Sequence, residues 1–190
     1  MSAKIDNSMV AAKAELRRRF LPERARVLYL FCGLGNMYHR AYRGRVDEYH
    51  GVDMNKVHDR TLCELGNNER YVRAHNLGRH NVFDLDDWGC PWKLLYLILA
   101  KQPPGEITVF VTDGIAERMK LSGAPSKFVS ATERIRRSFT IPGILRWYPE
   151  IFATMLLDLK RRYGWETVSA SYFHNPKHTV YYWALKMRKR

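Results

Sequence analysis

The stretch RVLYLFCGLGN, residues 26–36, runs from an apolar segment directly into a glycine-rich turn. Residues 26–31 are aliphatic or aromatic after the first position, which predicts a short, buried β-strand. Gly33 and Gly35 follow, and glycine permits a positive φ and a close approach of the backbone to a ligand. A strand that ends in such a turn is typical of a nucleotide-binding α/β sheet, although this turn lacks the third glycine of the dinucleotide fingerprint.

Helix and strand patterns alternate along the chain around this stretch. Helices are predicted over residues 6–20, 38–43, 56–65, 92–101 and 148–163, and strands over residues 26–31, 48–53, 71–74, 82–85, 106–114, 165–173 and 179–187. Such alternation with short connections predicts an α/β fold with a largely parallel sheet. The final two strands are joined only by HNPKH, residues 174–178, and therefore predict an antiparallel hairpin at the edge of the sheet.

Composition and charge narrow the class of protein. Of the 190 residues, 46% are hydrophobic, which favours a single folded domain over residues 1–190 rather than a disordered chain. We expect an N-terminal helix within residues 1–22 and an irregular insertion over residues 118–147. The 32 Lys and Arg against 19 Asp and Glu give a net charge of +13, partly in clusters, which favours nucleic acid as the partner. Solvated helix faces are the alternative explanation of such clusters.

The sequence also carries expectations about location and metals. It has no apolar run of the roughly 20 residues that span a membrane and no recognisable signal peptide, so we expect a cytoplasmic protein with no membrane partner. The cysteines Cys32, Cys63 and Cys90 are too widely spaced for a disulfide framework or a zinc site, which favours a reducing compartment. Cys32 and Cys63 are expected to be buried and inert. The histidines show no ligand spacing, so no metal is predicted.

An acidic residue follows the second predicted strand. Parallel sheets bind ligands at the carboxyl ends of their strands, near the point where the strand order reverses. Asp53 follows EYHGV at such an end, where its carboxylate can accept hydrogen bonds from ribose hydroxyls. A role as the N-cap of the next segment is the alternative for Asp53 alone. Together with Gly33 and Gly35, Asp53 predicts a cofactor that contains a nucleoside.

The stretch DLDDWGCPW, residues 84–92, lies between a predicted strand and a predicted helix. Trp92 begins the helix and is expected in the core beneath it. Trp88 is interpreted as a face on which a base stacks, with core packing as its alternative. The role of Asp84 is open, because alternation along the strand turns it away from Leu85. Asp113, at the end of the strand that follows, either lines the same pocket or caps the next element.

The stretches VLYLFCGLGN, GVDMN and FDLDDWGCPW resemble the motifs of the class I S-adenosylmethionine-dependent methyltransferases, and the resemblance covers nearly all of the chain. It implies a Rossmann-like fold: a mostly parallel, seven-stranded sheet with a reversed C-terminal edge hairpin and helices on both faces. It also implies S-adenosylmethionine as the cofactor. The cofactor-binding residues that it implies are Phe31, Cys32, Gly33, Leu34, Gly35, Asp53, Met54, Asn76 and Asp86. Asn76 would contact the adenine ring, and a loop-capping role is its alternative.

The third stretch is most similar to the tRNA guanine-N2 dimethyltransferases, whose loop reads D-L-D-P-[FY]-G-S-P. Asp87 stands where that family has proline, and the chain has no room for the family's extra C-terminal domain. The positions that match are Asp84, Leu85, Asp86, Gly89 and Pro91, while Trp88 and Cys90 replace the aromatic residue and the serine. The similarity implies methylation of an exocyclic amino group of a base in DNA or RNA, by a catalytic loop of Asp86, Asp87, Trp88 and Gly89.

Methyl transfer requires an amine that is aimed at the methyl group and whose protons are accepted. Asp86 would accept those protons, and Trp88 would stack on the base. Substrate binding is assigned to Trp88 and, within the irregular insertion, to Arg134, Arg136 and Arg137. Two alternatives remain open: a cytosine-C5 methyltransferase that uses Cys90 as its nucleophile, and a non-catalytic methyltransferase-like module that binds nucleic acid.

Overall fold

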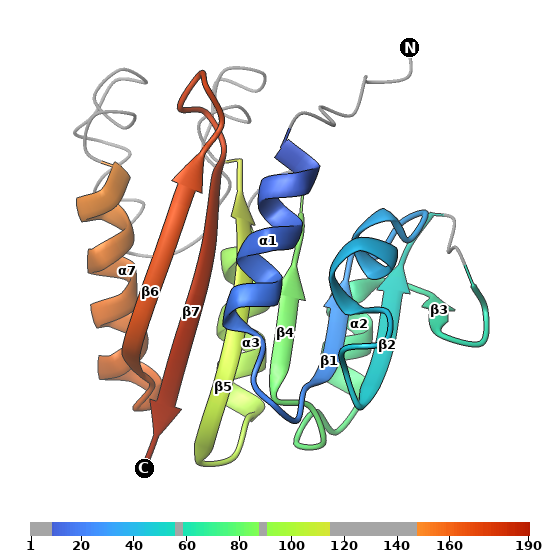
Figure 1. The fold of residues 1–190 in the computed structure, drawn as a ribbon. Helices are drawn as coiled ribbons and strands as arrows, with labels where there is room; N and C mark the ends of the chain where they lie inside the picture. The colour runs from blue at the N-terminus through green and yellow to red at the C-terminus, as the bar shows by residue number, and fades with distance from the viewer. Residues whose placement is uncertain (1–8, 56–58, 88–90, 115–147) are drawn as a thin grey trace.

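The structure is a computed structural model that describes residues 9–55, 59–87, 91–114 and 148–190. The described residues form a twisted sheet of seven strands with helices on both faces (Figure 1). In chain order the elements are α1 (Val10–Phe20), β1 (Arg26–Leu30), the π-helical turn η2 (Tyr38–Tyr42), β2 (Glu48–Asp53), β3 (Cys63–Leu65), α2 (Asn68–Ala74), β4 (Val82–Leu85), α3 (Trp92–Lys101), β5 (Gly105–Asp113), α7 (Tyr148–Tyr163), β6 (Glu166–His174) and β7 (Tyr181–Lys189).

The strand order is β3-β2-β1-β4-β5-β7-β6. The pairs from β3 to β5 are parallel, whereas β7 runs antiparallel to both β5 and β6. The predicted largely parallel sheet and its reversed C-terminal hairpin are therefore confirmed. From β1 the chain proceeds to β2, toward one edge of the sheet. From β4 it proceeds to β5, toward the opposite edge. The topological switch point lies between the neighbouring strands β1 and β4.

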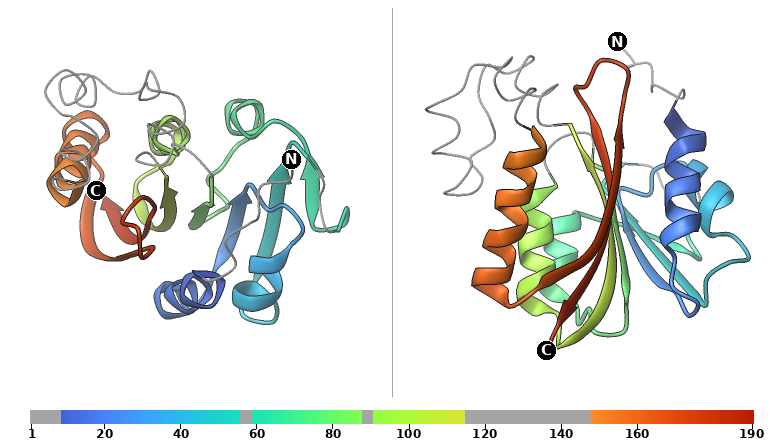
Figure 2. Two further views of the ribbon diagram at one scale, coloured as in Figure 1. Left: turned by 90° about the horizontal axis from the view of Figure 1, so that it is seen from above. Right: turned by 60° about the vertical axis from the view of Figure 1, so that its left-hand side comes forward.

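Side-chain alternation gives each face of the sheet its own core. Along β1, Val27 and Tyr29 face α1 and η2, whereas Leu28 and Leu30 face α2, α3 and α7. Figure 2 shows α1 and η2 on one side of the sheet and the other three helices on the opposite side. We name the two sides the α1 face and the α3 face.

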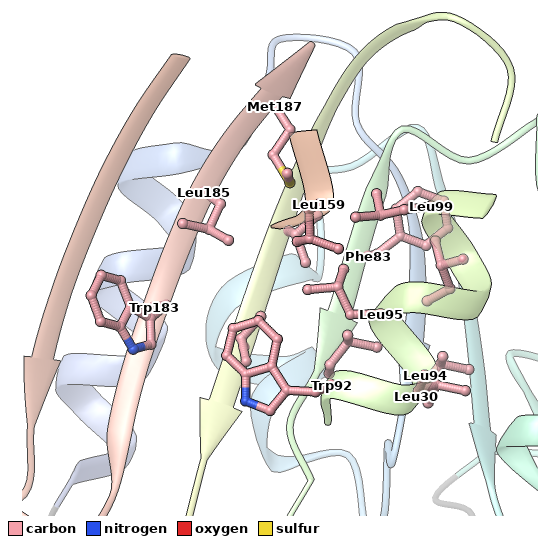
Figure 3. Close-up of a cluster of buried hydrophobic side chains, with 14 of the residues drawn as sticks. Leu30, Phe83, Trp92, Leu94, Leu95, Leu99, Leu159, Trp183, Leu185 and Met187 are labelled. Carbon is pink, nitrogen blue, oxygen red and sulfur yellow. The ribbon is translucent and has the colours of Figure 1, made fainter. Parts of the chain in front are cut away.

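The α3 face carries the larger apolar cluster. Figure 3 shows Trp183, Leu185 and Met187 of β7 beside Leu159 of α7 and Trp92 of α3, and all five side chains are buried. The α3 sequence WKLLYLILAK places several aliphatic side chains on the sheet, and α3 matches its predicted range of residues 92–101. The prediction that Trp92 lies in the core is confirmed, since its side chain is fully buried.

The predictions for residues 56–65 and 71–74 were wrong. Instead of a helix, the first segment ends in strand β3, in which Cys63 pairs with Gly51 of β2. Before this strand, the Asp59 carboxylate accepts bonds from the backbone amide and the hydroxyl of Thr61, and such an Asx turn competes with helix formation. Instead of a strand, the second segment lies in helix α2, because the Asn67 side chain accepts the Arg70 amide as an N-cap.

The other predicted elements are present within one or two residues of their expected bounds, except that α1 begins at Val10 rather than at residue 6. Residues 1–8 and 115–147, which include the predicted insertion, lie outside the described residues. Within the described residues, no helix is long and apolar enough to cross a membrane.

Candidate cofactor and catalytic site

The predicted cofactor residues after β1 and β2 lie next to each other at the carboxyl edge of the sheet. The carboxylate of Asp53, at the end of β2, accepts the backbone amide of Gly33 at 2.9 Å and that of Asn55 at 2.8 Å. Gly33 and Gly35 have φ values of +51° and +77°, in the left-handed region that glycine adopts without strain. The turn after β1 is therefore held against the acid at the end of β2, as the prediction of a nucleoside site requires.

Phe31 is the last residue before this turn and has a φ of +75°. A bulky residue in the left-handed region costs of order 1–3 kcal/mol, and such strain concentrates at functional sites. The Phe31 amide donates to the Val52 carbonyl at 2.8 Å, which fixes the turn to the end of β2. The folded sheet thus stabilises a backbone shape that Phe31 disfavours.

Three large apolar side chains are exposed around this edge. Leu34 is 65% exposed, Met54 is 62% exposed and Leu65 is 55% exposed. They follow or end β1, β2 and β3, so they lie along one edge of the sheet. Asn67, just after β3, donates from its side-chain amide to the Met54 sulfur at 3.1 Å. Apolar side chains beside a few polar groups are the usual lining of a small-molecule site, and they suit an adenine ring. Leu65 and Asn67 were not predicted as site residues.

Asn76 does not belong to this edge. It was assigned to the site because residues 71–74 were predicted to be a strand that ends there. These residues instead form helix α2, and Asn76 follows it close to Pro103, which precedes β5. Its side chain accepts the Gly78 amide at 2.9 Å, which is the loop-capping alternative. The prediction that Asn76 contacts the adenine ring was therefore wrong in its placement.

Asp86 lies directly after β4, at the switch point, and its carboxylate is heavily bonded. One oxygen accepts the Lys13 ammonium at 2.5 Å and the Thr112 hydroxyl at 2.6 Å. The other accepts the Tyr29 hydroxyl at 3.2 Å and lies 3.6 Å from the Arg17 guanidinium. Burial disfavours the charge on Asp86, but Lys13 and Arg17 outweigh it and hold the pKa of this carboxyl well below its usual range.

Asp84, two residues earlier on β4, receives a role that the sequence left open. Its side chain is fully buried on the α1 face, where Arg17 of α1 donates to both of its oxygens at 2.6 and 2.7 Å. The Tyr42 hydroxyl is a third donor to the same carboxylate. Such a two-point guanidinium–carboxylate contact fixes geometry as well as charge. Asp84 therefore attaches α1 to the centre of the sheet.

The spacing of the two ion pairs, Lys13–Asp86 and Arg17–Asp84, is visible in the sequence. Lys13 and Arg17 are four residues apart on a helix, a rise of about 6 Å. Asp84 and Asp86 are two residues apart on an extended segment, about 6.6 Å. The cations of α1 therefore match the anions of β4 one to one. This spacing could have revealed Lys13 and Arg17, which the sequence analysis missed together with Tyr29, Tyr42 and Thr112.

Asp113, at the end of β5, lies on the α3 face. Its carboxylate accepts the indole N–H of Trp92 at 2.6 Å and the hydroxyl of Tyr148 at 2.5 Å. The side chain is buried. Asp113 thus fixes the starts of α3 and α7 at the carboxyl end of the sheet, and neither of its two predicted roles describes these contacts.

Two thiols meet beside the turn after β1. Cys32 and Cys63 are both buried, as predicted, and they share a hydrogen bond. Both sulfurs lie over Gly51 of β2, where a Cβ atom would be 2.6 Å from the Cys63 sulfur and 2.9 Å from the Cys32 sulfur. Gly51 is therefore required by packing rather than by backbone conformation.

Several predicted residues lie outside the described residues: Trp88, Gly89, Cys90, Arg134, Arg136 and Arg137. Asp87 is described and half-buried. The basic cluster at the end of α7 is partly neutralised, since Lys160 pairs with Glu166 and Arg162 pairs with Asp158. Within the described residues there is no group of three or more His, Cys, Asp or Glu side chains that could hold a metal ion.

Comparison with known proteins identifies the fold but no family: no protein family and no curated sequence matches the chain. The 1,6-didemethyltoxoflavin-N1-methyltransferase of Burkholderia thailandensis, solved with S-adenosylhomocysteine, is 15% identical over 97% of this chain and 79% of its own, with a TM-score of 0.54. TYW2 of M. jannaschii, solved with AdoMet, is 10% identical over 100% of this chain and 80% of its own, with a TM-score of 0.55. A candidate hemolysin from Streptococcus thermophilus is 10% identical over 100% of this chain and 70% of its own, with a TM-score of 0.57. The predicted Rossmann-like methyltransferase fold is confirmed.

Proposed function

We propose that the chain is an S-adenosylmethionine-dependent methyltransferase that acts on an exocyclic amino group of a nucleic-acid base. The observation that carries this proposal is the Gly33–Asp53 contact at the carboxyl ends of β1 and β2, the same edge of the sheet at which Asp86 follows β4. Asp53 would accept the ribose hydroxyls, Leu34, Met54 and the unpredicted Leu65 would surround the adenine, and Asp86 would face the reacting amine. The structural neighbours that hold AdoMet or S-adenosylhomocysteine support the same cofactor.

The chemistry divides between cofactor and chain. When bound, S-adenosylmethionine supplies an electrophilic methyl group. The residues of the chain would position the acceptor: Asp86 would accept hydrogen bonds from the amine, Trp88 would stack on the base, and the glycine turn would hold the backbone close to the ligand. Because the pKa of Asp86 is held low, its carboxylate stays an acceptor at neutral pH.

Cofactor binding is tested by thermal denaturation and calorimetry with S-adenosylmethionine and S-adenosylhomocysteine. A ligand at 100 times its Kd adds about 2.7 kcal/mol to the free energy of unfolding. Gly35→Leu and Asp53→Ala should bind both ligands more weakly, because one fills the backbone approach and the other removes the ribose acceptor. Asp47→Ala, which removes an exposed acid at the start of β2, is the matched control. No stabilisation of the unaltered chain by either ligand would favour the non-catalytic module instead.

Nucleic acid as the substrate is supported by the net charge of +13. We assign its phosphate contacts to Arg134, Arg136 and Arg137, since the cluster at the end of α7 already pairs with acids. Replacing the three arginines by alanine should weaken polynucleotide binding and reduce its salt dependence by about one unit of slope per lost phosphate contact. Replacing Lys160, Arg161 and Arg162 is the control and should have a much smaller effect. The opposite ranking would contradict the assignment.

The acceptor atom is identified by transfer of a labelled methyl group to unmodified DNAs and RNAs, followed by mass analysis of the nucleosides. Cys90→Ser should keep its activity if an amine is the acceptor and should lose it if Cys90 attacks a pyrimidine ring. A folded, inactive Cys90→Ser variant, with the unaltered chain producing C5-methylcytosine, would establish the rival chemistry.

The contact between Lys13 and Asp86 favours a second candidate reaction, methylation of a hydroxyl group. A hydroxyl is a weaker nucleophile than an amine and gains reactivity when a cation stabilises the negative charge that develops on its oxygen as its proton passes to water, and the ammonium of Lys13 is such a cation. In a nucleic acid the hydroxyls are those of ribose, so the product would be an O-methylated sugar on RNA. The same labelled-transfer experiment distinguishes this product from a methylated base.

A further inference from the structure

One oxygen of the Asp86 carboxylate has no capacity left for a ligand in the conformation described. It accepts both Lys13 and Thr112, and a carboxylate oxygen accepts about two hydrogen bonds. The other oxygen accepts Tyr29 and lies 3.6 Å from the Arg17 guanidinium. An amine that binds the first oxygen must therefore replace one of its two donors.

The three donors and the neighbouring Arg17 differ in how firmly they are held. Thr112 and Tyr29 come from β5 and β1, so their hydroxyls cannot leave without moving the sheet. Arg17 is 2% exposed and bonded to both oxygens of Asp84. Lys13 is 15% exposed, comes from the second turn of α1, and ends a flexible four-carbon chain. Lys13 is thus the donor that can leave at the smallest cost.

Lys13 also has another contact within reach. Its ammonium lies 5.3 Å from the centroid of the Tyr182 ring on β7, which is within the range of a cation–π interaction. A rotation of the side chain away from Asp86 and over this ring would keep the ammonium beside a favourable partner.

Charge balance explains why a cation must be at Asp86 at all. The cluster holds two carboxylates, Asp84 and Asp86, and two cations, Arg17 and Lys13. Asp86 is 11% exposed, so its charge without a partner would be strongly unfavourable. A ligand that brings its own ammonium restores the charge balance when it replaces Lys13, whereas a neutral base amine supplies only hydrogen bonds and leaves Arg17 as the cation nearest to Asp86.

We propose that the ammonium of Lys13 occupies a binding subsite for the amino group of a ligand, and that the ligand displaces it. This proposal rests on the proposed function for the identity of the ligand. The amino group has two possible sources: the ammonium of the cofactor's methionine part, or the amine of the substrate base. In either case Lys13 is an internal competitor that lowers the affinity of the subsite until the ligand arrives.

Two ligands that differ in the amino group test the proposal by calorimetry. S-adenosylhomocysteine carries the ammonium, whereas 5′-methylthioadenosine has the same nucleoside without the amino-acid part. If Lys13 competes with the cofactor, Lys13→Met should bind S-adenosylhomocysteine about tenfold more tightly, the factor that 1.4 kcal/mol represents. The affinity for 5′-methylthioadenosine should not change. Lys160→Met, which removes another paired lysine, is the matched control and should change neither affinity.

The second possible source of the amino group, the amine of the substrate base, is tested with the nucleic acid that accepts methyl groups. If Lys13 competes with the substrate amine, Lys13→Met should leave the affinity for S-adenosylhomocysteine unchanged and lower the KM for the nucleic acid. Lys13→Gln, which keeps a donor but no charge, should change the same quantity in the same direction to a smaller extent. It also serves if Lys13→Met does not fold. Lys13→Arg keeps the charge and should resemble the unaltered chain.

Two results would overturn the proposal. Weaker binding of S-adenosylhomocysteine by Lys13→Met, with 5′-methylthioadenosine unaffected, would mean that Lys13 binds the ligand's carboxylate instead of competing with its ammonium. A loss of kcat with both affinities and KM unchanged would mean that Lys13 takes part in proton transfer. Failure of the unaltered chain to bind either nucleoside would refute the proposed cofactor itself, which is a separate result.

Discussion

Both faces of the sheet have an apolar core, but among the described residues the α1 face adds buried ion pairs between a helix and the sheet. Under α1, the centre of the sheet carries Asp84 and Asp86, paired with two cations of the helix. Under α3 and α7, aliphatic and aromatic side chains pack along the sheet (Figure 3). The buried acid Asp113 lies at the carboxyl end of β5. Hydrophobic packing involves no titratable group, whereas a buried ion pair is lost when either of its members is removed or loses its charge. Helix α1, which borders the candidate site, is thus attached to the sheet partly by ion pairs that require specific partners.

The largest effect is expected from breaking the buried pair on the α1 face. Arg17→Met leaves the Asp84 carboxylate fully buried without its cation, which should lower the free energy of unfolding by about 4 kcal/mol. Urea denaturation measures this change. The double variant Arg17→Met/Asp84→Leu should recover most of the loss, because two apolar side chains need no partner. A double variant as unstable as the single one would show that Arg17 acts through packing alone.

A somewhat smaller effect is expected from the α3 face. Leu95 is fully buried between α3 and the sheet, and Leu95→Ala should cost about 3 kcal/mol through lost packing and the cavity it leaves. The loss should be the same at pH 5 and pH 8, since the nearest interactions are apolar. A loss that depends on pH would contradict the division of forces between the faces.

Acid should remove the stability that Asp86 contributes to the α1 face, whereas the pKa of Asp84, raised by burial, does not add to this loss. The pKa of Asp86 is lower in the folded chain than in the unfolded chain, so the unfolded state binds more protons as the pH falls. The stability that Asp86 contributes is complete above a pH of about 4 and is lost progressively below it. Asp86→Asn should therefore have a flatter acid limb in a plot of unfolding free energy against pH, by of order 1 kcal/mol. Parallel limbs for the two proteins would refute the assignment.

The smallest effect is expected from an ion pair outside both cores. Lys160 and Glu166 are both about half exposed, so water and salt screen their attraction. Lys160→Met should leave the midpoint of urea denaturation unchanged within error. A measurable loss would mean that charge pairs stabilise this chain wherever they occur, and not specifically beneath α1.

Much of the fold is predictable from local patterns. The segment EITVFVTDG and the helix that begins at Trp92 carry long apolar signals, and both elements are where the sequence predicts them. The third strand was misplaced because β3 is three residues long, which is too short for a period to be visible. The prediction placed this strand at residues 71–74 instead. The Asn67 cap, which starts α2 upstream of them, was the signal that would have excluded it.

The residues of the candidate site that lie at the end of a strand were predictable. The residues that reach the site only through contact between distant segments were missed. Gly33 and Asp53 each follow a strand, so parallel strands bring them to one edge. Lys13 contacts Asp86 across 73 positions of sequence, and a periodicity in one segment cannot show which distant segment it meets. Trp88 and the three arginines of the insertion remain predictions.

Gly51 has a consequence for how this sequence can change over generations. Its missing side chain is the space that the Cys32 and Cys63 sulfurs fill, and a methyl group there would be 2.6 Å from the nearer sulfur. Alanine at position 51 therefore requires that the sulfurs of both Cys63 and Cys32 move or are replaced by smaller groups. We therefore expect positions 32, 51 and 63 to co-vary among homologous sequences, although 31 positions separate the first from the last.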